Sequence, residues 1–573
     1  MKSNIFISGI IALSILGGCQ KLDQEVITTL DYQKVIQSYD YIKSLNSGVY
    51  ANLMNGFLYI NGQAMMASAT DESEHTLETA NVQKFNIGAW NAYDNPDNVW
   101  SGYFTGIRRA NQFLVSSDSV NLNQYKYDPL PASQTVYQTR LAEIKNWKYE
   151  ARFLRAFFYF ELLKRYGGVP IISTIGSIND NNSSVKRNTF AECVKFISDE
   201  CDSAAAKLPV KYALAGDLGR VTKGAALALK SRLLLYTASD LYNLPASWSG
   251  GYAFPELISV SGDRKTKWQA AADAALAVIN LAGTSYALGT SYSSLFGSGT
   301  YNNAEIIFRR GNSNDNAFER ASTPIGYDNG SSGTTPSQNL VDDYEVIVNS
   351  TTCVPFDWNN PVHAANPYSN RDPRLGFTVL KNGDVIKGRA IEPFIGGLDG
   401  KPKNDATKTG YYLNKYVNNT LNLLTGTTSN HAWVYFRFTE MFLNYAEALN
   451  EANPGHTDIA LYVNKVRQRS GVNMPALPIG LTQTQMRDAI RHERKIEFAF
   501  EDQRYWDVRR WMLGDTYFNV PLKGVSITKN TDGSFSYTRI NVENRVFQPK
   551  MYFYPIPQSE LYIATSWKQN PLW

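Results

Sequence analysis

Residues 142–168 read AEIKNWKYEARFLRAFFYFELLKRYGG, and this stretch decides the fold class. Two basic residues, Lys164 and Arg165, stand shortly before a Gly-Gly pair. Cations in the last turn and a glycine just beyond it are the usual signals that end a helix. The pattern therefore predicts a helix over residues 141–166.

Residues 97–113 are the predicted partner of this helix. Apolar side chains recur there at spacings of three and four residues, at Trp100, Phe104, Ile107, Ala110 and Phe113. This spacing places them on one face of an amphipathic helix. Arg108 and Arg109 should then point outward.

Similar helical patterns recur along the chain. They cover residues 192–208, 222–241, 268–281, 432–452 and 458–470. Small side chains such as Ala446 and Ala448 let antiparallel helices approach closely, which is the physical basis of tetratricopeptide-type stacking. We therefore predict a mainly all-α fold, with a scaffold of tetratricopeptide-like helical hairpins over residues 41–287 and 431–573.

Residues 288–430 interrupt this scaffold with a long, loop-rich segment. Ser, Gly, Asn, Asp and Pro dominate it, and residues 305–309 and 410–413 are short extended pieces, so short strands are expected. It also carries the aromatic residues Phe318, Tyr327, Tyr344, Phe356, Trp358 and Tyr368. These argue against disorder, and a change from helices to aromatic loops indicates where a ligand site should be sought.

The first nineteen residues are typical of a lipoprotein signal peptide. A basic start, Met1-Lys2, precedes an apolar run over residues 5–16 and the small-residue box LGGC that ends in Cys19. The run is too short to span a membrane. We expect residues 1–18 to be removed, Cys19 to carry lipid chains, and residues 19–40 to form a tether. The alternative is an ordinary secretory signal in which the cysteine is coincidental.

Charge and cysteine content exclude several classes of partner. The formal charge of +4 comes from 56 basic and 52 acidic residues without basic runs, so nucleic acid is not an expected partner. Beyond Cys19 there are Cys193, Cys201 and Cys353. Cys193 and Cys201 lie about 12 Å apart along one predicted helix, too far for a disulfide, and five histidines without a Cys or His cluster do not favour a metal site.

The charged stretch HERKIE at residues 492–497 superficially resembles a zinc-protease helix. The position of the required second histidine is Ile496, so metal catalysis is rejected. Glu493, Glu497 and Glu501 follow one helix face, and Arg494, Arg504, Arg509 and Arg510 lie close in sequence. We interpret these residues, and likewise Arg152 and Arg155, as a structural ion-pair network between helices.

No motif for catalysis is present. A G-x-S-x-G elbow is missing, and the glycines of residues 330–333 are not followed by the residues of a phosphate loop. A glycosidase needs two carboxylates about 5–10 Å apart, but with 52 acidic residues some pair meets that distance by chance. We expect no catalytic residue, no cofactor and no metal.

Ten short stretches together resemble the SusD/RagB surface lipoproteins of Bacteroidetes nutrient-uptake systems. They are CQKLD (19–23), residues 100–111, EARFLRA (150–156) running to YGGVP (166–170), GRVTKGA (219–225), NRDPRL (370–375), RFTE (437–440) through YAEALN (445–450), NKVRQR (464–469), residues 493–511, YPIPQ (554–558) and QNP (569–571). Each stretch alone occurs in many proteins, but their order together with the lipoprotein box is specific for this family. The resemblance covers nearly the whole mature chain.

This resemblance implies a function as well as a fold. A SusD-like protein is a non-enzymatic lipoprotein of the outer-membrane surface. It captures an oligosaccharide or polysaccharide and passes it to a SusC-like TonB-dependent barrel, over which it sits as a lid. The alternatives left open are a surface glycoside hydrolase and a peptide-binding, structural or adhesive surface lipoprotein.

Two segments offer the side chains that sugar binding requires. Flat rings contact the C–H faces of a sugar, and polar groups bind its hydroxyls. The candidates are Asp71, His75, Trp90 and Tyr93 in the first segment and Phe318, Tyr327 and Asn329 in the second. By resemblance, the stretch after Thr70-Asp71-Glu72 lines the glycan site, although residues 73–77 lack the tryptophans of the family's starch binder. We expect all seven side chains to converge on one exposed surface.

Overall fold

The computed structural model describes residues 35–176, 185–283, 285–297 and 303–573. The predicted signal peptide, Cys19 and most of the predicted tether lie outside these ranges. Within them the fold is mostly helical, with 44% helix and 11% strand in small sheets. The prediction of a helical scaffold with a strand-containing insertion is confirmed.

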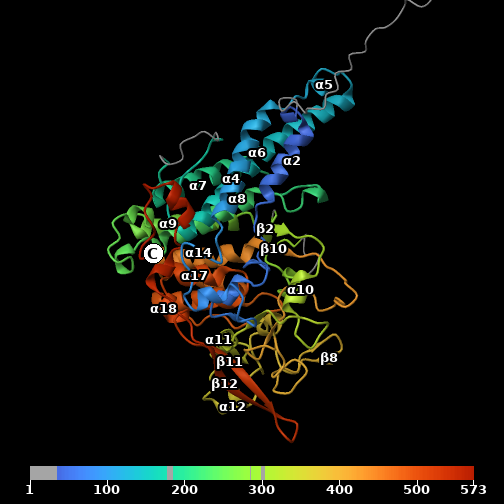
Figure 1. Cartoon of the computed structure of the whole chain (residues 1–573), viewed down its shortest axis with the longest axis vertical. Helices are drawn as coiled ribbons and strands as arrows, with labels where there is room; N and C mark the ends of the chain where they lie inside the picture. The colour runs from blue at the N-terminus through green and yellow to red at the C-terminus, as the bar shows by residue number, and fades with distance from the viewer. Residues whose placement is uncertain (1–34, 177–184, 284, 298–302) are drawn as a thin grey trace, which may run out of the picture.

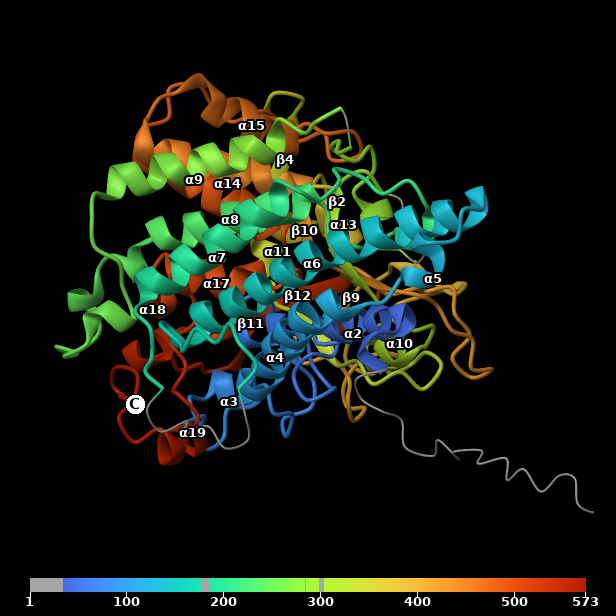
Figure 2. The same cartoon turned by 90° about the horizontal axis from the view of Figure 1, so that it is seen from above.

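The scaffold is a row of helices in which each packs against the next along the chain (Figures 1 and 2). The row consists of α2 (Tyr39–Tyr50), α4 (Trp100–Ser116), α6 (Pro131–Tyr166), α7 (Phe190–Ala205), α8 (Lys223–Ala238), α9 (Arg264–Ile279), α14 (Phe438–Ala452) and α15 (Thr457–Arg467). Helices α9 and α14 are far apart in sequence, but they are neighbours in the structure. The loop-rich insertion therefore leaves the helical row unbroken.

Helix α6 is the longest element of the row, and its chemistry explains both of its ends. It starts with Pro131, whose missing N–H costs nothing in the first turn of a helix. It stops at Gly167, which has a positive φ of 71°. The predicted end is confirmed, whereas the start lies before the predicted residue 141. From Phe153 to Tyr166 every side chain is buried, because α4, α7 and the sheet β2–β10 surround this half.

Residues 432–437 were predicted to be helical, and this prediction is wrong. They form strand β10 (Ala432–Arg437), which pairs antiparallel with β2 (Ile306–Gly311), and α14 begins only at Phe438. The segment WVYF at 433–436 consists of aromatic and β-branched residues that favour strands. Pairing with β2, which is far away in sequence, stabilises residues 432–437 as a strand.

The other strands form small antiparallel pairs, mostly in the loop-rich region. They are β1 (Ser73–His75) with β3 (Thr334–Pro336), β4 (Val346–Asn349) with β5 (Thr352–Val354), β6 (Val379–Leu380) with β9 (Tyr412–Leu413), β7 (Val385–Ile386) with β8 (Arg389–Ala390), and β11 (Leu522–Lys529) with β12 (Phe535–Glu543). Strands β2 and β9 confirm the two predicted extended pieces. Figure 1 shows the hairpin β11–β12 at the end of the molecule opposite α2 and α5 (Asn123–Lys126).

Further helices, all short except the 15-residue α16, complete the fold. They are α3 (Gln83–Asn86), α10 (Ala317–Ser322), α11 (Gln338–Asp343), α12 (Pro361–Ala365), α13 (Arg374–Thr378), α16 (Gln483–Glu497), α17 (Gln503–Arg510), α18 (Gly514–Tyr517) and α19 (Gln558–Ile563). The loop-rich region packs into a second hydrophobic core, in which its residues Tyr344, Val379 and Tyr411 join residues of other segments such as Val525 of β11. This core explains why the aromatic loops take one conformation.

The glutamates of residues 493–501 form the predicted ion-pair network, and all of it is buried. Glu497 pairs with Arg437 and Arg469 at 2.7 Å each and with Arg374 at 2.9 Å. Glu493 pairs with Arg374 and Arg467. The arginine partners thus come from distant segments, whereas the sequence-local Arg494 and Arg510 bind Asp507.

The same interpretation holds for the arginines of α6. Both Arg152 and Arg155 bind Glu200 of α7 at 2.7 Å. Cys193 and Cys201, also in α7, are both free thiols, so the prediction that they do not pair is confirmed. Among the described residues, no helix is both long and apolar enough to span a membrane.

Candidate functional site

Strand β1, in the first segment predicted to bind sugar, pairs with strand β3, which begins shortly after the second segment. Ser73 lies opposite Pro336, and His75 lies opposite Thr334. Beyond the strands, the backbone N–H of Thr76 donates to the carbonyl of Gly333 at 2.9 Å. Five of the seven predicted side chains are nevertheless buried, so they do not form the expected common exposed surface.

Asp71 and His75 support the fold of the first segment. The carboxylate of Asp71 accepts hydrogen bonds of 2.8 Å from Arg504 and from Lys495. Burial alone would raise the pKa of Asp71, but these two positive charges outweigh it and hold the pKa well below its usual range. Burial lowers the pKa of His75, whose Nδ1 accepts from the backbone N–H of Leu77 at 3.2 Å.

Trp90 belongs to an aromatic cluster in the core and is only 2% exposed. Its ring centroid lies 4.7 Å from that of Trp573 and 5.1 Å from those of Phe85 and Tyr554. Its faces and edges are therefore occupied by Phe85 of α3 and by the C-terminal segment of the chain. A sugar could reach this ring only if that packing opened.

The two aromatic candidates of the second segment are also covered. Phe318 packs against Phe57, with ring centroids 4.8 Å apart. The guanidinium of Arg389 lies 3.6 Å from the ring centroid of Tyr327, and the Tyr327 hydroxyl donates to the Arg389 carbonyl at 3.0 Å. Asp399 holds Arg389 in place through two hydrogen bonds of 2.7 Å.

Tyr93 and Asn329 are the exposed members of the predicted set. Asn329 has a positive φ of 57°, in the left-handed region that asparagine tolerates. Tyr93 is 76% exposed and stands on a turn in which Asn91 Oδ1 accepts from the backbone N–H groups of Tyr93 and Asp94, at 2.8 and 3.2 Å. An asparagine turn of this kind holds the backbone with a side chain and leaves the tyrosine ring free.

A second exposed tyrosine stands beside Tyr93. Tyr562 of α19 is 67% exposed, and its hydroxyl lies 3.0 Å from that of Tyr93. This hydrogen bond raises the pKa of Tyr93. The backbone N–H of Gln558 donates to the carbonyl of Ala92 at 3.1 Å, which attaches α19 to the turn. Figure 2 shows α19 and α3 next to each other near the C-terminus.

We call Tyr93 and Tyr562 the tyrosine pair, and polar groups lie on the turn that carries Tyr93. Lys84 of α3 forms an ion pair of 2.7 Å with Asp94, directly after Tyr93. Ile563, next to Tyr562, is 58% exposed. The site thus combines two flat rings with donors and acceptors, which is the combination that a sugar requires.

A separate polar cavity of about 490 Å³ borders the end of β1. It is lined by residues 76–79, by the loop 401–408 and by residues 540–542 of β12. Among the described residues that line it, there is no aromatic ring. This cavity can bind hydroxyl groups but offers no stacking platform, so the tyrosine pair is the better candidate.

Sequence reasoning missed Tyr562. Its segment follows YPIPQ at 554–558, which was noted only as a piece of the family resemblance. The available signal was the apolar sequence LYI at 561–563, where exposed apolar side chains end a short helix. No spacing in the sequence indicates that this helix lies beside residue 93.

Comparison with known proteins assigns the family. Residues 304–573 match the SusD family, and residues 21–235 match a second family described as starch-binding associating with outer membrane. This chain belongs to the SusD/RagB family. The prediction of family membership is therefore confirmed.

Two relatives that support this assignment differ in sequence identity and in the share of the chain that they cover. A SusD-like protein of Bacteroides ovatus is 22% identical over 477 residues, which cover 81% of this chain and 76% of that protein. A SusD-like protein of Formosa agariphila is 37% identical over 117 residues, but these cover only 20% of this chain and 23% of the relative. The strong local match thus involves less than a quarter of the Formosa protein.

Solved structures confirm the fold over almost the whole SusD-like chain. A SusD-like protein of Bacteroides fragilis superimposes with a TM-score of 0.77 at 26% identity, covering 95% of this chain and 99% of that one. A second protein of the same species, described as a SusD-like carbohydrate-binding protein, gives a TM-score of 0.74 at 24% identity over 92% and 99%. At that identity the second likeness shows the fold alone.

Proposed function

We propose that this protein is a cell-surface lipoprotein that binds an oligosaccharide or polysaccharide and passes it to a TonB-dependent outer-membrane transporter. The observation that carries the proposal is the exposed tyrosine pair in a chain of the SusD/RagB family. One of the two matching family descriptions names starch binding and association with the outer membrane, which supports glycan binding and a location at that membrane.

The tyrosine pair suits a sugar because its two rings are held but not covered. Their hydroxyls bond to each other at 3.0 Å, so the rings have lost part of their freedom before a ligand arrives. Ordering side chains on binding costs about 0.5–1.5 kcal/mol for each one. A platform that is already ordered avoids much of that cost. Lys84, Asp94 and Asn91 would then bind hydroxyl groups around the stacked ring.

Anchoring would give the proposed delivery step its efficiency. A lipid on Cys19 confines the protein to the membrane surface, where the barrel also resides. A tethered partner acts at a high effective concentration and so needs no large binding energy of its own. The proposed partner is therefore a TonB-dependent barrel that contacts one face of the helical scaffold.

We propose that the protein binds glycans without cleaving them. Asp94, directly after Tyr93, is engaged by an ion pair with Lys84, whereas a glycosidase needs two carboxylates that act together across the scissile bond. Incubation with labelled oligosaccharides and product analysis tests this point. Product in excess of the protein would favour a hydrolase instead.

Calorimetry against a panel of plant, microbial and host polysaccharides tests the site. For the best ligand, Tyr93→Ala and Tyr562→Ala should each weaken binding roughly 5- to 150-fold, the effect of losing a central anchor worth about 1–3 kcal/mol. Tyr127→Ala is the matched control, because Tyr127 is also 71% exposed but belongs to the segment after α5. Unchanged affinity in both site variants would reject the tyrosine pair, and binding to peptides but to no glycan would reject the function.

A further inference from the structure

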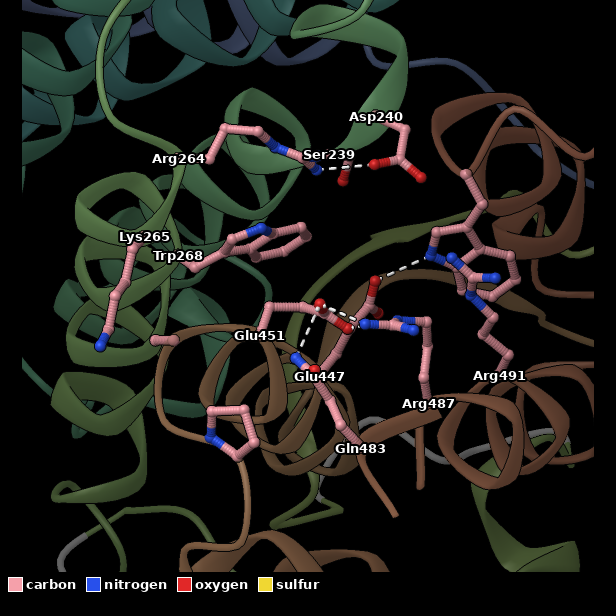
Figure 3. A pocket seen from close by; sticks show the side chains of 13 residues that line it. Ser239, Asp240, Arg264, Lys265, Trp268, Glu447, Glu451, Gln483, Arg487 and Arg491 are labelled. Atoms are coloured by element: carbon pink, nitrogen blue, oxygen red, sulfur yellow. Dashed lines mark hydrogen bonds and ion pairs between the residues drawn. The ribbon is translucent and has the colours of Figure 1, made fainter. Parts of the chain in front are cut away.

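A polar cavity of about 620 Å³ lies between helices of the scaffold and shares no lining residue with the tyrosine pair (Figure 3). Helix α9 supplies Arg264 and Trp268, helix α14 supplies Glu447 and Glu451, and helix α16 supplies Arg487 and Arg491. Its other polar and aromatic lining residues are Ser239, Asp240, Lys265, Gln483 and Trp511. This volume is in the range of small-molecule sites, which occupy about 300–1,000 Å³.

Most charges on the wall of this cavity are paired. Arg264 binds Asp240 at 2.6 Å, and Arg487 binds both oxygens of Glu451 at 2.6 and 2.7 Å. The carboxylate of Glu447 accepts from Arg510 and from the indole N–H of Trp511, at 2.7 Å each. These pairs leave no free carboxylate among the three that line the cavity.

Two lining cations lie outside these pairs among the described residues, the exposed Lys265 and the partly buried Arg491. Within the described parts of the chain Arg491 forms no hydrogen bond and no ion pair, and its Nε is shielded from solvent without an acceptor. Its guanidinium instead lies 4.9 Å from the ring centroid of Trp511. Burial lowers the pKa of Arg491. The nearby carboxylates of Glu447 and Asp240 are already bound to other arginines, so burying this guanidinium is costly, and an anion that filled the cavity would relieve that cost.

We infer that this cavity binds the carboxylate of an acidic sugar, a uronate residue, with Arg491 as the partner of the carboxylate. The planar guanidinium fork matches a carboxylate through two parallel hydrogen bonds. Trp268 and Trp511 give the cavity aromatic walls, and Gln483 and Ser239 can bind hydroxyls. The choice of a sugar over other carboxylates rests on the proposed function, whereas the choice of an anion rests on Arg491.

Calorimetry with trigalacturonate and with its fully methyl-esterified form tests the inference, because esterification removes the charge of each carboxylate and adds only a methyl group. The mature wild-type chain should bind the free acid about 10-fold or more tightly than the ester at low salt, as expected for a charged hydrogen-bonded pair. Arg491→Gln should remove this preference, and Arg491→Lys should keep part of it. Arg108→Gln is the control, because Arg108 is exposed on α4 and lies outside the cavity.

Several outcomes would overturn the inference. They are equal affinity of the wild type for acid and ester, a preference that survives in Arg491→Gln, and tighter binding of a tripeptide with a free C-terminal carboxylate. Arg491→Gln should also leave the melting temperature unchanged or raised, because no ion pair is lost, and a large decrease would assign Arg491 a structural role. If neutral glycans bind through the tyrosine pair while uronates ignore Arg491, this inference fails and the proposed function stands. If no glycan binds at all, both fail.

Discussion

The guanidinium of Arg220 donates three hydrogen bonds of 2.8–3.0 Å to the carboxylate of Glu150, which is completely buried in α6. The hydroxyls of Tyr50 and Tyr212 each donate to the same carboxylate at 2.8 Å. Glu150 belongs to the stretch EARFLRA and Arg220 to the stretch GRVTKGA. Two of the motifs that indicated the family are therefore the two halves of one buried contact, which joins α2, α6 and the segment before α8.

Arg220→Met should destabilise the protein strongly. The substitution leaves a charged Glu150 buried without its cation, and breaking a buried pair in this way costs about 3–5 kcal/mol. The double variant Arg220→Met/Glu150→Met should recover part of that loss, because no charge remains unpaired. Urea unfolding of the single and double variants measures both effects.

Lys195→Met is the control for this experiment. Lys195 forms an ion pair of 2.8 Å with Asp199, but both side chains are largely exposed. Exposed pairs contribute about 0–1 kcal/mol. A loss in Arg220→Met no larger than in Lys195→Met would contradict a structural role for the buried pair.

Glu72 makes stability depend on pH. This side chain is 1% exposed, and its Oε1 has no hydrogen-bond partner. Burial, and secondarily the charge of Asp71, raises the pKa of Glu72 from 4.5 to about 8. The folded protein therefore holds a proton that the unfolded chain releases near pH 4.5. The free energy of unfolding therefore decreases as the pH rises from about 4.5 to 8. Above pH 8, the folded protein bears the full cost of a buried, ionised Glu72.

Glu72→Gln removes this titration with little change in shape. The variant should equal the wild type near pH 4 and exceed it in free energy of unfolding by about 2–5 kcal/mol at pH 9, since each pKa unit corresponds to about 1.4 kcal/mol. Urea midpoints between pH 4 and 9 measure the difference. The exposed Glu256→Gln should show no such trend. A variant that is less stable than the wild type at pH 9 would contradict the argument.

Trp90→Ala should affect stability and not binding. The indole fills a space between Trp573, Phe85 and Tyr554, so its removal leaves a core cavity, at a cost of about 3–5 kcal/mol. Thermal unfolding tests the stability, and calorimetry well below the melting temperature tests glycan affinity. Lost affinity with unchanged stability would return Trp90 to the binding site.

The sequence predicted the helical row better than the site, and particular residues show why. Helix α4 follows from the three- and four-residue spacing of Trp100, Phe104 and Ile107, which is a local property. The strand at residues 432–437 depends on β2, which no local pattern indicates. Whether an aromatic loop residue faces inward likewise depends on distant partners, as Trp573 covers Trp90 and Arg389 covers Tyr327.

The predicted anchor at Cys19 lies outside the described residues and can be tested directly. Mass spectrometry of the membrane-extracted protein should find a mature chain that begins at an acylated Cys19, because the LGGC box is typical of lipoprotein cleavage sites and two or more acyl chains hold a protein stably on a membrane. Cys19→Ala should release the protein from the membrane fraction. If the tether supplies the effective concentration, the same substitution should also abolish co-purification of a TonB-dependent barrel in mild detergent. Cys353→Ala, which removes a free and half-buried thiol, should change neither result. A Cys19→Ala protein that stays on the membrane would reject the lipid anchor, and a wild-type protein recovered only alone beside an intact barrel would reject the proposed partner.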